Sequence, residues 1–130
     1  MYSKKIIGSK GEDITTEYLK NLGYIILERN YMTRRWEIDI IAKEKDEIVF
    51  VVVKTRNLLV CGFPAEAVDI NKQKHLYRCA EYYLYRNNLL SSYCRFDVIE
   101  VYLNNNIPKI VHLKNVEINC WKYVAKWKRL

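Results

Sequence analysis

The most constraining feature of the sequence is an uninterrupted apolar run, Ile48–Val53, which ends at Lys54. A strand that is apolar on both faces must be covered on both faces, so we expect it at the centre of a sheet. The apolar run before it, 36–42, carries Glu37 and Asp39, and strand alternation places their side chains on one face. The two runs therefore bring two carboxylates and a lysine together. This arrangement suits either a metal and phosphate site or a simple strand end where solvent begins.

The rest of the chain supplies helices and strands for one α/β domain of 130 residues. The periodicity of apolar residues predicts helices over 9–22 and 65–86. Strands are expected over 24–29, 36–42, 48–54, 94–103 and 110–113, with a polar hairpin at 43–46 and a loop at 55–63. The order is helix, three strands, helix, strand, and the first three strands form an antiparallel meander.

Glu12 has two roles open to it. The stretch from Ser9 to Glu12 fits a capping box, in which Glu12 closes the start of the first helix. A glutamate exposed at a helix start can also reach a metal site shared with the strands. The helix that follows has its apolar residues on one stripe and ends at a glycine: Ile14, Tyr18, Leu22 and Gly23.

The composition favours a polyanionic partner. The formal net charge is +7 and the pI is about 9.2. The four cysteines form no C-x-x-C pair, and neither His75 nor His112 has a metal-ligand neighbour at helical spacing, so a zinc site is not expected. No signal peptide and no apolar run of membrane-spanning length is visible, so we expect a cytoplasmic protein with reduced cysteines.

Six residues are candidates for contacts with a nucleic-acid backbone, although each can also lie on a solvated face. Two belong to the basic connection after the first strand, one to the loop after the third, and three to the second helix. They are Arg34, Arg35, Arg56, Lys72, Gln73 and Lys74.

Several motifs together resemble the YraN-like uncharacterised family, over about residues 7–113. The element order looks like the core of the PD-(D/E)XK nuclease superfamily. This resemblance implies a restriction-endonuclease-like αβββαβ core, a mixed central sheet flanked by helices. Residues 114–130 lie beyond the resemblance and are expected to be an accessory basic tail. The motifs are G-S-K-G-E-D (8–13), L-G-Y-I-I-L-E-R-N-Y (22–31), W-E-I-D-I-I-A (36–42), V-F-V-V-V-K-T-R (49–56), F-P-A-E-A-V (63–68) and R-F-D-V-I-E-V (95–101).

The resemblance also implies a site. Asp39 matches the family's metal-binding aspartate, and Lys54 matches its catalytic lysine. Glu12 and Glu37 match two further glutamates, and the carbonyl of Val53 corresponds to a backbone metal ligand. The family is similar to archaeal Holliday junction resolvases, which cut branched DNA with magnesium and are dimers. We therefore expect Mg²⁺ or Mn²⁺ as cofactor, DNA rather than RNA as partner, and a homodimer.

Two positions depart from the family pattern. Trp36 stands where the family has glycine, and Val52 stands where the family has the glutamate of E-x-K. A valine cannot bind a metal ion, so we expect weak metal binding and impaired activity. The expected function is a metal-dependent endonuclease acting on the phosphodiester backbone of branched or single-stranded DNA. The alternative is a non-catalytic nucleic-acid-binding module on the same fold.

Overall fold

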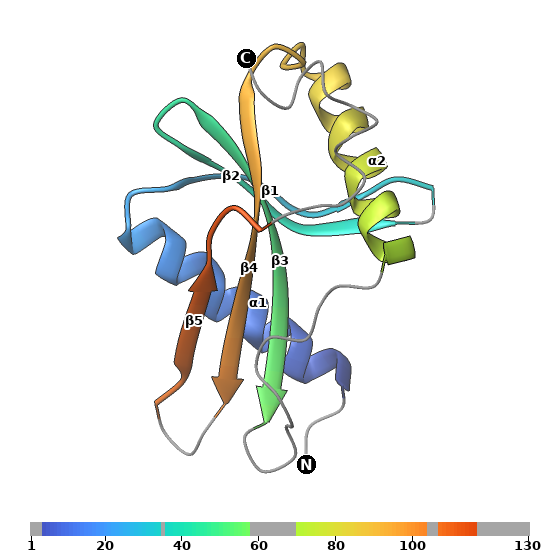
Figure 1. The fold of residues 1–130 in the computed structure, drawn as a ribbon. Helices are drawn as coiled ribbons and strands as arrows, with labels where there is room; N and C mark the ends of the chain where they lie inside the picture. Colours follow the sequence, from blue (N-terminus) through green and yellow to red (C-terminus); the bar gives the residue numbers. More distant parts are fainter. Residues whose placement is uncertain (1–3, 35, 58–69, 104–106, 117–130) are drawn as a thin grey trace.

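The computed structural model of the chain describes residues 4–34, 36–57, 70–103 and 107–116. Within these ranges the elements follow the predicted order, and the predicted edge strand over 110–113 is present (Figure 1). They are α1 (Lys4–Asn21), β1 (Ile25–Met32), β2 (Glu37–Glu44), β3 (Glu47–Asn57), α2 (Ile70–Arg86), β4 (Tyr93–Leu103) and β5 (Lys109–Leu113). The predicted helical residues 65–69, the loop over 58–63 and the basic tail from 117 onward lie outside the described ranges.

The strands form one mixed sheet in the order β1-β2-β3-β4-β5. The first three are antiparallel neighbours, β4 runs parallel to β3, and β5 returns antiparallel along β4. The antiparallel meander and the central position of the third strand are therefore confirmed. The parallel step requires a crossover, and α2 lies in it.

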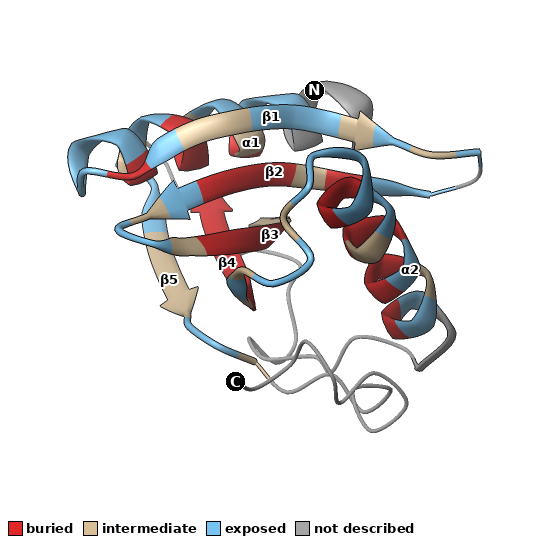
Figure 2. Cartoon of the chain, turned by 90° about the horizontal axis from the view of Figure 1, so that it is seen from above, coloured by how far each residue is buried: buried red, intermediate tan, exposed pale blue. Residues whose placement is uncertain are grey.

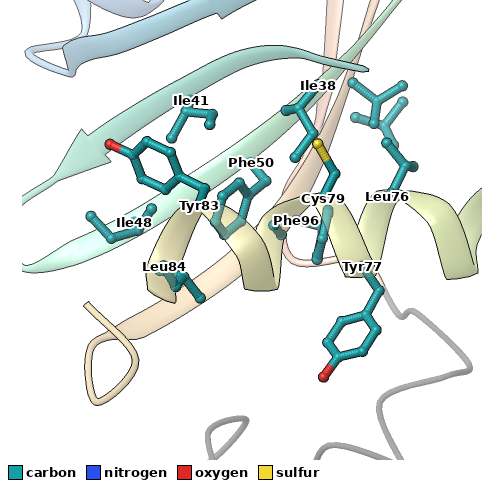
Figure 3. Close-up of a cluster of buried hydrophobic side chains, with 13 residues drawn as sticks. Ile38, Ile41, Ile48, Phe50, Leu76, Tyr77, Cys79, Tyr83, Leu84 and Phe96 are labelled. Carbon is teal, nitrogen blue, oxygen red and sulfur yellow. The ribbon is translucent and has the colours of Figure 1, made fainter. Parts of the chain in front are cut away.

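The central strand β3 is apolar on both faces because a helix covers each of them (Figure 2). Ile48, Phe50 and Val52 belong to the buried cluster that contains the apolar face of α2. In that cluster the ring of Phe50 packs against those of Phe96 and Tyr83, at centroid distances of 5.3 and 6.1 Å (Figure 3). The residues between them in β3 pack on the other side, with Leu19 of α1.

Helix α1 differs from the prediction at its start. It begins at Lys4, so Ser9 and Glu12 lie inside the helix and the capping-box prediction is wrong. The buried stripe is also displaced, because Leu19 and Thr15 are fully buried while Leu22 is exposed. The prediction that Gly23 ends the helix is confirmed by its φ of 97° and by a hydrogen bond from its N–H to the Lys20 carbonyl.

Gly11 explains how α1 comes close to the sheet. A Cβ atom at this position would run into the side chain of Thr55 in β3. Glycine therefore allows the third turn of α1 to lie directly against the end of β3, which brings Glu12 to the sheet.

Two strand boundaries also differ from the prediction. The turn between β2 and β3 consists of Lys45 and Asp46 instead of four residues, with Lys45 at a φ of 54°. Strand β3 continues through Asn57, so Thr55 and Arg56 lie in a strand and not in a loop. The extension follows from the parallel pairing with β4, which holds the backbone of these polar residues along its whole length.

Candidate functional site

The candidate site lies where β2 and β3 separate. Their paired residues run from Glu44 opposite Glu47 to Ile40 opposite Val51, and stop there. One step further along β2, Oδ2 of Asp39 accepts a hydrogen bond of 2.8 Å from the backbone N–H of Val53. The Asp39 carboxylate thus accepts the hydrogen bond that a backbone carbonyl of β2 would accept in a regular sheet. This hydrogen bond holds Asp39 in the opening between the strands.

Strand alternation is interrupted at Asp39. The neighbouring residues Ile38 and Ile40 are both fully buried, but they pack in the clusters on opposite sides of the sheet. Glu37, which is exposed, nevertheless lies close enough for its negative charge to raise the pKa of Asp39. The expected proximity of the two carboxylates is therefore present, although strict alternation does not explain it.

Helix α1 adds Glu12 to these carboxylates. Its pKa is raised to about 7, first by burial and then by the negative charges of Asp39 and Glu37. For Asp39, burial raises the pKa, while the Val53 N–H and a hydrogen bond with Glu12 lower it. Burial and the two neighbouring carboxylates thus both favour the protonated form of Glu12.

Arg29 of β1 is a site residue that the sequence did not single out. Its Nη2 lies 3.9 Å from Oε1 of Glu12 and 2.8 Å from Oδ1 of Asp13. Its positive charge lowers the pKa of Glu12 but does not offset the effect of burial. Nothing in the local pattern around Arg29 distinguishes it from the other basic residues of the chain, so only the strand pairing could identify it.

Strand β3 contributes the remaining predicted positions. Continuing the β2–β3 register by one step places Val52 opposite Asp39. Val52 is only 5% exposed and packs in the α2-side core, while Lys54 is half-buried two residues later on the same strand face. It is the N–H of Val53 that contacts Asp39; a role for its carbonyl as a metal ligand stays a prediction.

The predicted nucleic-acid contacts fall into different environments. Lys72, at the start of α2, lies near enough to Asp39 for its charge to lower the pKa of that carboxyl. Lys74 and Arg34 are exposed, Gln73 is buried, and Arg35 lies outside the described residues.

Arg56 is half-buried in strand β3, and its contact with a nucleic-acid backbone stays a prediction. Its side chain is 16% exposed, and its Nε is 3.5 Å from Oε2 of the buried Glu100 in β4. Arg56 and Glu100 extend from adjacent parallel strands toward the α2 side of the sheet, so their charges compensate one another in a partly buried place.

The donor set fits a magnesium ion in part. In the ranges that the structure describes, no three His, Cys, Asp or Glu side chains are grouped closely enough to hold a metal. Mg²⁺, however, commonly binds through one or two carboxylates and completes its shell with water and phosphate oxygens. Asp39 and the hydrogen-bonded Glu12 supply such a pair, and a divalent cation would favour the ionised form of Glu12 against burial and against the charges of Asp39 and Glu37.

The raised pKa of Glu12 predicts a pH-dependent effect of Glu12→Gln. The folded state holds the Glu12 proton up to about pH 7, whereas the ordinary glutamate pKa is 4.5, so ionisation costs stability as the pH rises between these values. In EDTA, we expect Glu12→Gln to increase the free energy of unfolding by about 2–3 kcal/mol at pH 8 and to change it little at pH 4.5. Urea denaturation at both pH values measures this.

The exposed Glu17 of the same helix provides the control, since Glu17→Gln should change stability little at either pH. An equal loss of stability by Glu12→Gln at both pH values would show that Glu12 is an ordinary structural carboxylate.

A second polar cluster is buried on the α1 side of the sheet. Arg95 of β4 donates hydrogen bonds to Asp97 (3.0 Å), Glu47 (2.6 Å) and the hydroxyl of Tyr24 (2.8 Å). Asp97, which is fully buried, also contacts Nε2 of His112 at 2.7 Å. The hydrogen bonds of this cluster join β2, β3, β4 and β5, so we interpret it as structural. The sequence analysis placed Arg95 and Asp97 in a motif but assigned them no role.

Two further expectations can be compared with the structure. Cys79 is buried and Cys94 is half-buried, and both are free thiols, while Cys61 and Cys120 lie outside the described residues. Among the described helices, none is long and apolar enough to cross a membrane.

The chain matches known proteins over the whole of this site. The model of the family described as Uncharacterised protein family UPF0102 matches residues 11–101. A UPF0102 protein of Caldicellulosiruptor saccharolyticus is 47% identical over 115 residues, which cover 87% of this chain and 98% of that protein. A UPF0102 protein of Clostridium botulinum strain 657 is 51% identical over 117 residues, covering 88% and 95%. The chain therefore belongs to the uncharacterised protein family UPF0102, the YraN-like family that its motifs resemble.

Proposed function

We propose that this protein is a metal-dependent, endonuclease-like protein that acts on the phosphodiester backbone of DNA. The observation that carries the proposal is the placement of Asp39, held by the Val53 N–H in the opening between β2 and β3, with Glu12 hydrogen-bonded beside it. Paired carboxylates next to a strand that carries a lysine suit phosphodiester hydrolysis with Mg²⁺. The resemblance of the element order to nuclease cores supports the same reading.

Each residue has a defined task in this proposal. Asp39 and Glu12, together with the carbonyl of Val53, would hold Mg²⁺ or Mn²⁺. The ion, when bound, supplies a nucleophilic water near neutral pH and polarises the phosphate. Lys54 orients the attacking water and offsets the charge that develops on the phosphate. Lys72, whose charge already reaches Asp39, attracts the DNA backbone.

The site lacks one carboxylate. Val52 lies opposite Asp39 in the extended register, where it offers no ligand, so the metal is bound weakly and cleavage is slow. The same observation favours a second candidate function, a nucleic-acid-binding module without hydrolysis. In that case Val52 belongs only to the core that it helps to fill. The two functions differ in whether the activity on DNA depends on a divalent metal ion.

The main test is cleavage of labelled four-way junction, flap and single-stranded DNA in Mg²⁺ or Mn²⁺. We expect Asp39→Ala to reduce the cleavage rate at least about 100-fold because it removes a metal ligand, and Lys54→Ala to reduce it similarly, while both still bind DNA. Glu28→Ala is the control, since it removes an exposed carboxylate of β1 outside the site. Cleavage that persists unchanged in Asp39→Ala would exclude this site. DNA binding without any cleavage would favour the binding module.

A further inference from the structure

A groove lies between the connection from β1 to β2 and one stripe of helix α2. Residues 32–34 and Trp36 line one side, and His75, Arg78, Cys79 and Tyr82 line the other. The groove has a volume of about 490 Å³, within the range of sites that take small ligands. From His75 to Tyr82 the helix rises by about 10 Å, at 1.5 Å per residue, which is enough for one or two nucleotides. None of the carboxylates considered above lines it.

Aromatic rings are presented at both ends of this groove. The ring of Trp36 stacks on that of His75, with centroids 3.6 Å apart and an angle of 10° between the planes. Trp36 is still 37% exposed, and Tyr82, two helical turns further along α2, is 46% exposed. The stack covers one face of the indole and holds it in place, so the exposed part forms a rigid planar surface.

Two contacts hold the backbone of Trp36 in place. The carbonyl of Trp36 accepts a hydrogen bond of 2.8 Å from the N–H of Thr33, and the thiol of Cys79 contacts the same carbonyl at 3.9 Å. A binding surface that is ordered before the ligand arrives loses less entropy on binding.

The charges that line the groove are positive. Arg34 and Arg78 are both exposed, and the lining residues include no carboxylate. Beyond Tyr82, the guanidinium of Arg86 lies over the tyrosine ring at 5.9 Å from its centroid. Exposed aromatic planes interleaved with arginines are complementary to nucleobases and phosphates, and every base offers a face for stacking.

We propose that this groove binds an unpaired nucleotide of a DNA strand, with its base against Trp36 and Tyr82 and the flanking phosphates at Arg34 and Arg78. Paired bases inside a duplex are stacked on each other and cannot present their faces in this way. Trp36 directly precedes the candidate site residues Glu37 and Asp39 in the chain. The inference rests on the proposed function, because the groove would select the DNA on which the proposed nuclease site acts. It makes single-stranded or unstacked DNA the substrate class of that site.

The test is a binding measurement without metal. The fluorescence anisotropy of a labelled 12-nucleotide oligo-dT and of a labelled hairpin duplex is followed in EDTA at several salt concentrations. We expect Trp36→Leu and Tyr82→Leu each to weaken oligo-dT binding about tenfold at every salt concentration, and to leave duplex binding unchanged. Trp36→Phe should recover part of the loss. Tyr85→Leu is the matched control, because Tyr85 is an exposed tyrosine of α2 outside the groove.

The arginines should behave differently from the rings. Arg78→Gln is expected to weaken binding and to reduce the slope of log K against log salt by about one, as for the loss of one phosphate contact. Lys109→Gln, at an exposed position of β5, should change neither. Thermal melts show which variants are folded, and Trp36→Phe remains informative if Trp36→Leu is not.

The proposal is overturned if the folded Trp36 and Tyr82 variants bind oligo-dT as the unmodified protein does, if they lose oligo-dT and duplex binding equally, or if no oligo-dT binds. Its failure is separable from that of the nuclease proposal. If oligo-dT binding depends on the groove residues but no metal supports cleavage, the groove proposal is supported and the nuclease proposal is rejected. If cleavage depends on Asp39 but the groove variants bind oligo-dT normally, the nuclease proposal is supported and the groove proposal is rejected.

Discussion

Replacing Val52 with glutamate is expected to increase the affinity for Mg²⁺ about 100-fold and to increase DNA cleavage by at least that factor. Continuing the β2–β3 register places position 52 opposite Asp39, so we expect the new carboxylate to reach the opening that holds Asp39. A pair of opposite unit charges 4 Å apart is worth about 4 kcal/mol at an effective dielectric of 20. If desolvation removes about a third of this, the remainder corresponds to roughly 100-fold in binding.

The same substitution should destabilise the protein without metal. Val52 is 5% exposed in the core, so an ionised glutamate there is desolvated and repelled by the negative charge of Asp39. We expect a loss of about 2–4 kcal/mol in EDTA, most of it recovered when Mg²⁺ is added. Thermal melts over a Mg²⁺ titration, together with the DNA cleavage assay, measure both effects.

Val52→Gln is the control for this prediction, since it has the same size as glutamate and no charge. It should be destabilised without recovery in Mg²⁺ and should not gain cleavage. If Val52→Glu is destabilised and Mg²⁺ neither stabilises it nor supports cleavage, position 52 is not part of a metal site. If the protein also binds DNA without cleaving it, the binding module is favoured.

Asp97→Ala is expected to reduce the free energy of unfolding by about 3–5 kcal/mol, a large part of the stability of a small domain. Asp97 is fully buried, and it accepts hydrogen bonds from Arg95 and from the N–H of Asn115. Its removal leaves the buried guanidinium of Arg95 with fewer partners and takes away the contact with His112. Urea denaturation at pH 7 measures the loss.

A comparison within the same cluster provides the control. Glu44 also accepts a hydrogen bond from Arg95, at 2.8 Å, but its side chain is more exposed, so Glu44→Ala should lose only about 1 kcal/mol. A loss below 1 kcal/mol for Asp97→Ala as well would show that the cluster contributes little to stability.

The effect of Asp97 should also depend on pH. Burial acts to raise its pKa, but the hydrogen bonds from His112 and Arg95 outweigh burial and keep the pKa below the ordinary value of 3.8. A carboxyl whose folded pKa is depressed stabilises the protein above its unfolded pKa and loses this contribution as the pH falls through the folded value. The stability difference between the unmodified protein and Asp97→Ala should therefore shrink as the pH falls below about 3.8.

Much of the fold follows from patterns along the chain. The doubly apolar run in β3 predicted a central strand, because such a strand must be covered on both faces, and in the structure a helix covers each face. The predictions that failed concern residues whose secondary structure is determined by partners distant in sequence. Thr55 and Arg56 look like loop residues in a local window, but the backbone of β4 pairs with them and extends the strand.

The sequence by itself determined the order of the elements, the family, and the positions of Asp39, Lys54 and Val52 along two adjacent strands. The tertiary structure determined which charged groups lie next to each other in and around the site. It placed Glu12 beside Asp39, turned Arg56 toward Glu100, and formed a groove by bringing Trp36 against α2. Hydrogen bonds, pKa shifts and grooves depend on which distant groups become neighbours and on how much water they exclude. A linear pattern carries the identity of these groups but not the distances between them.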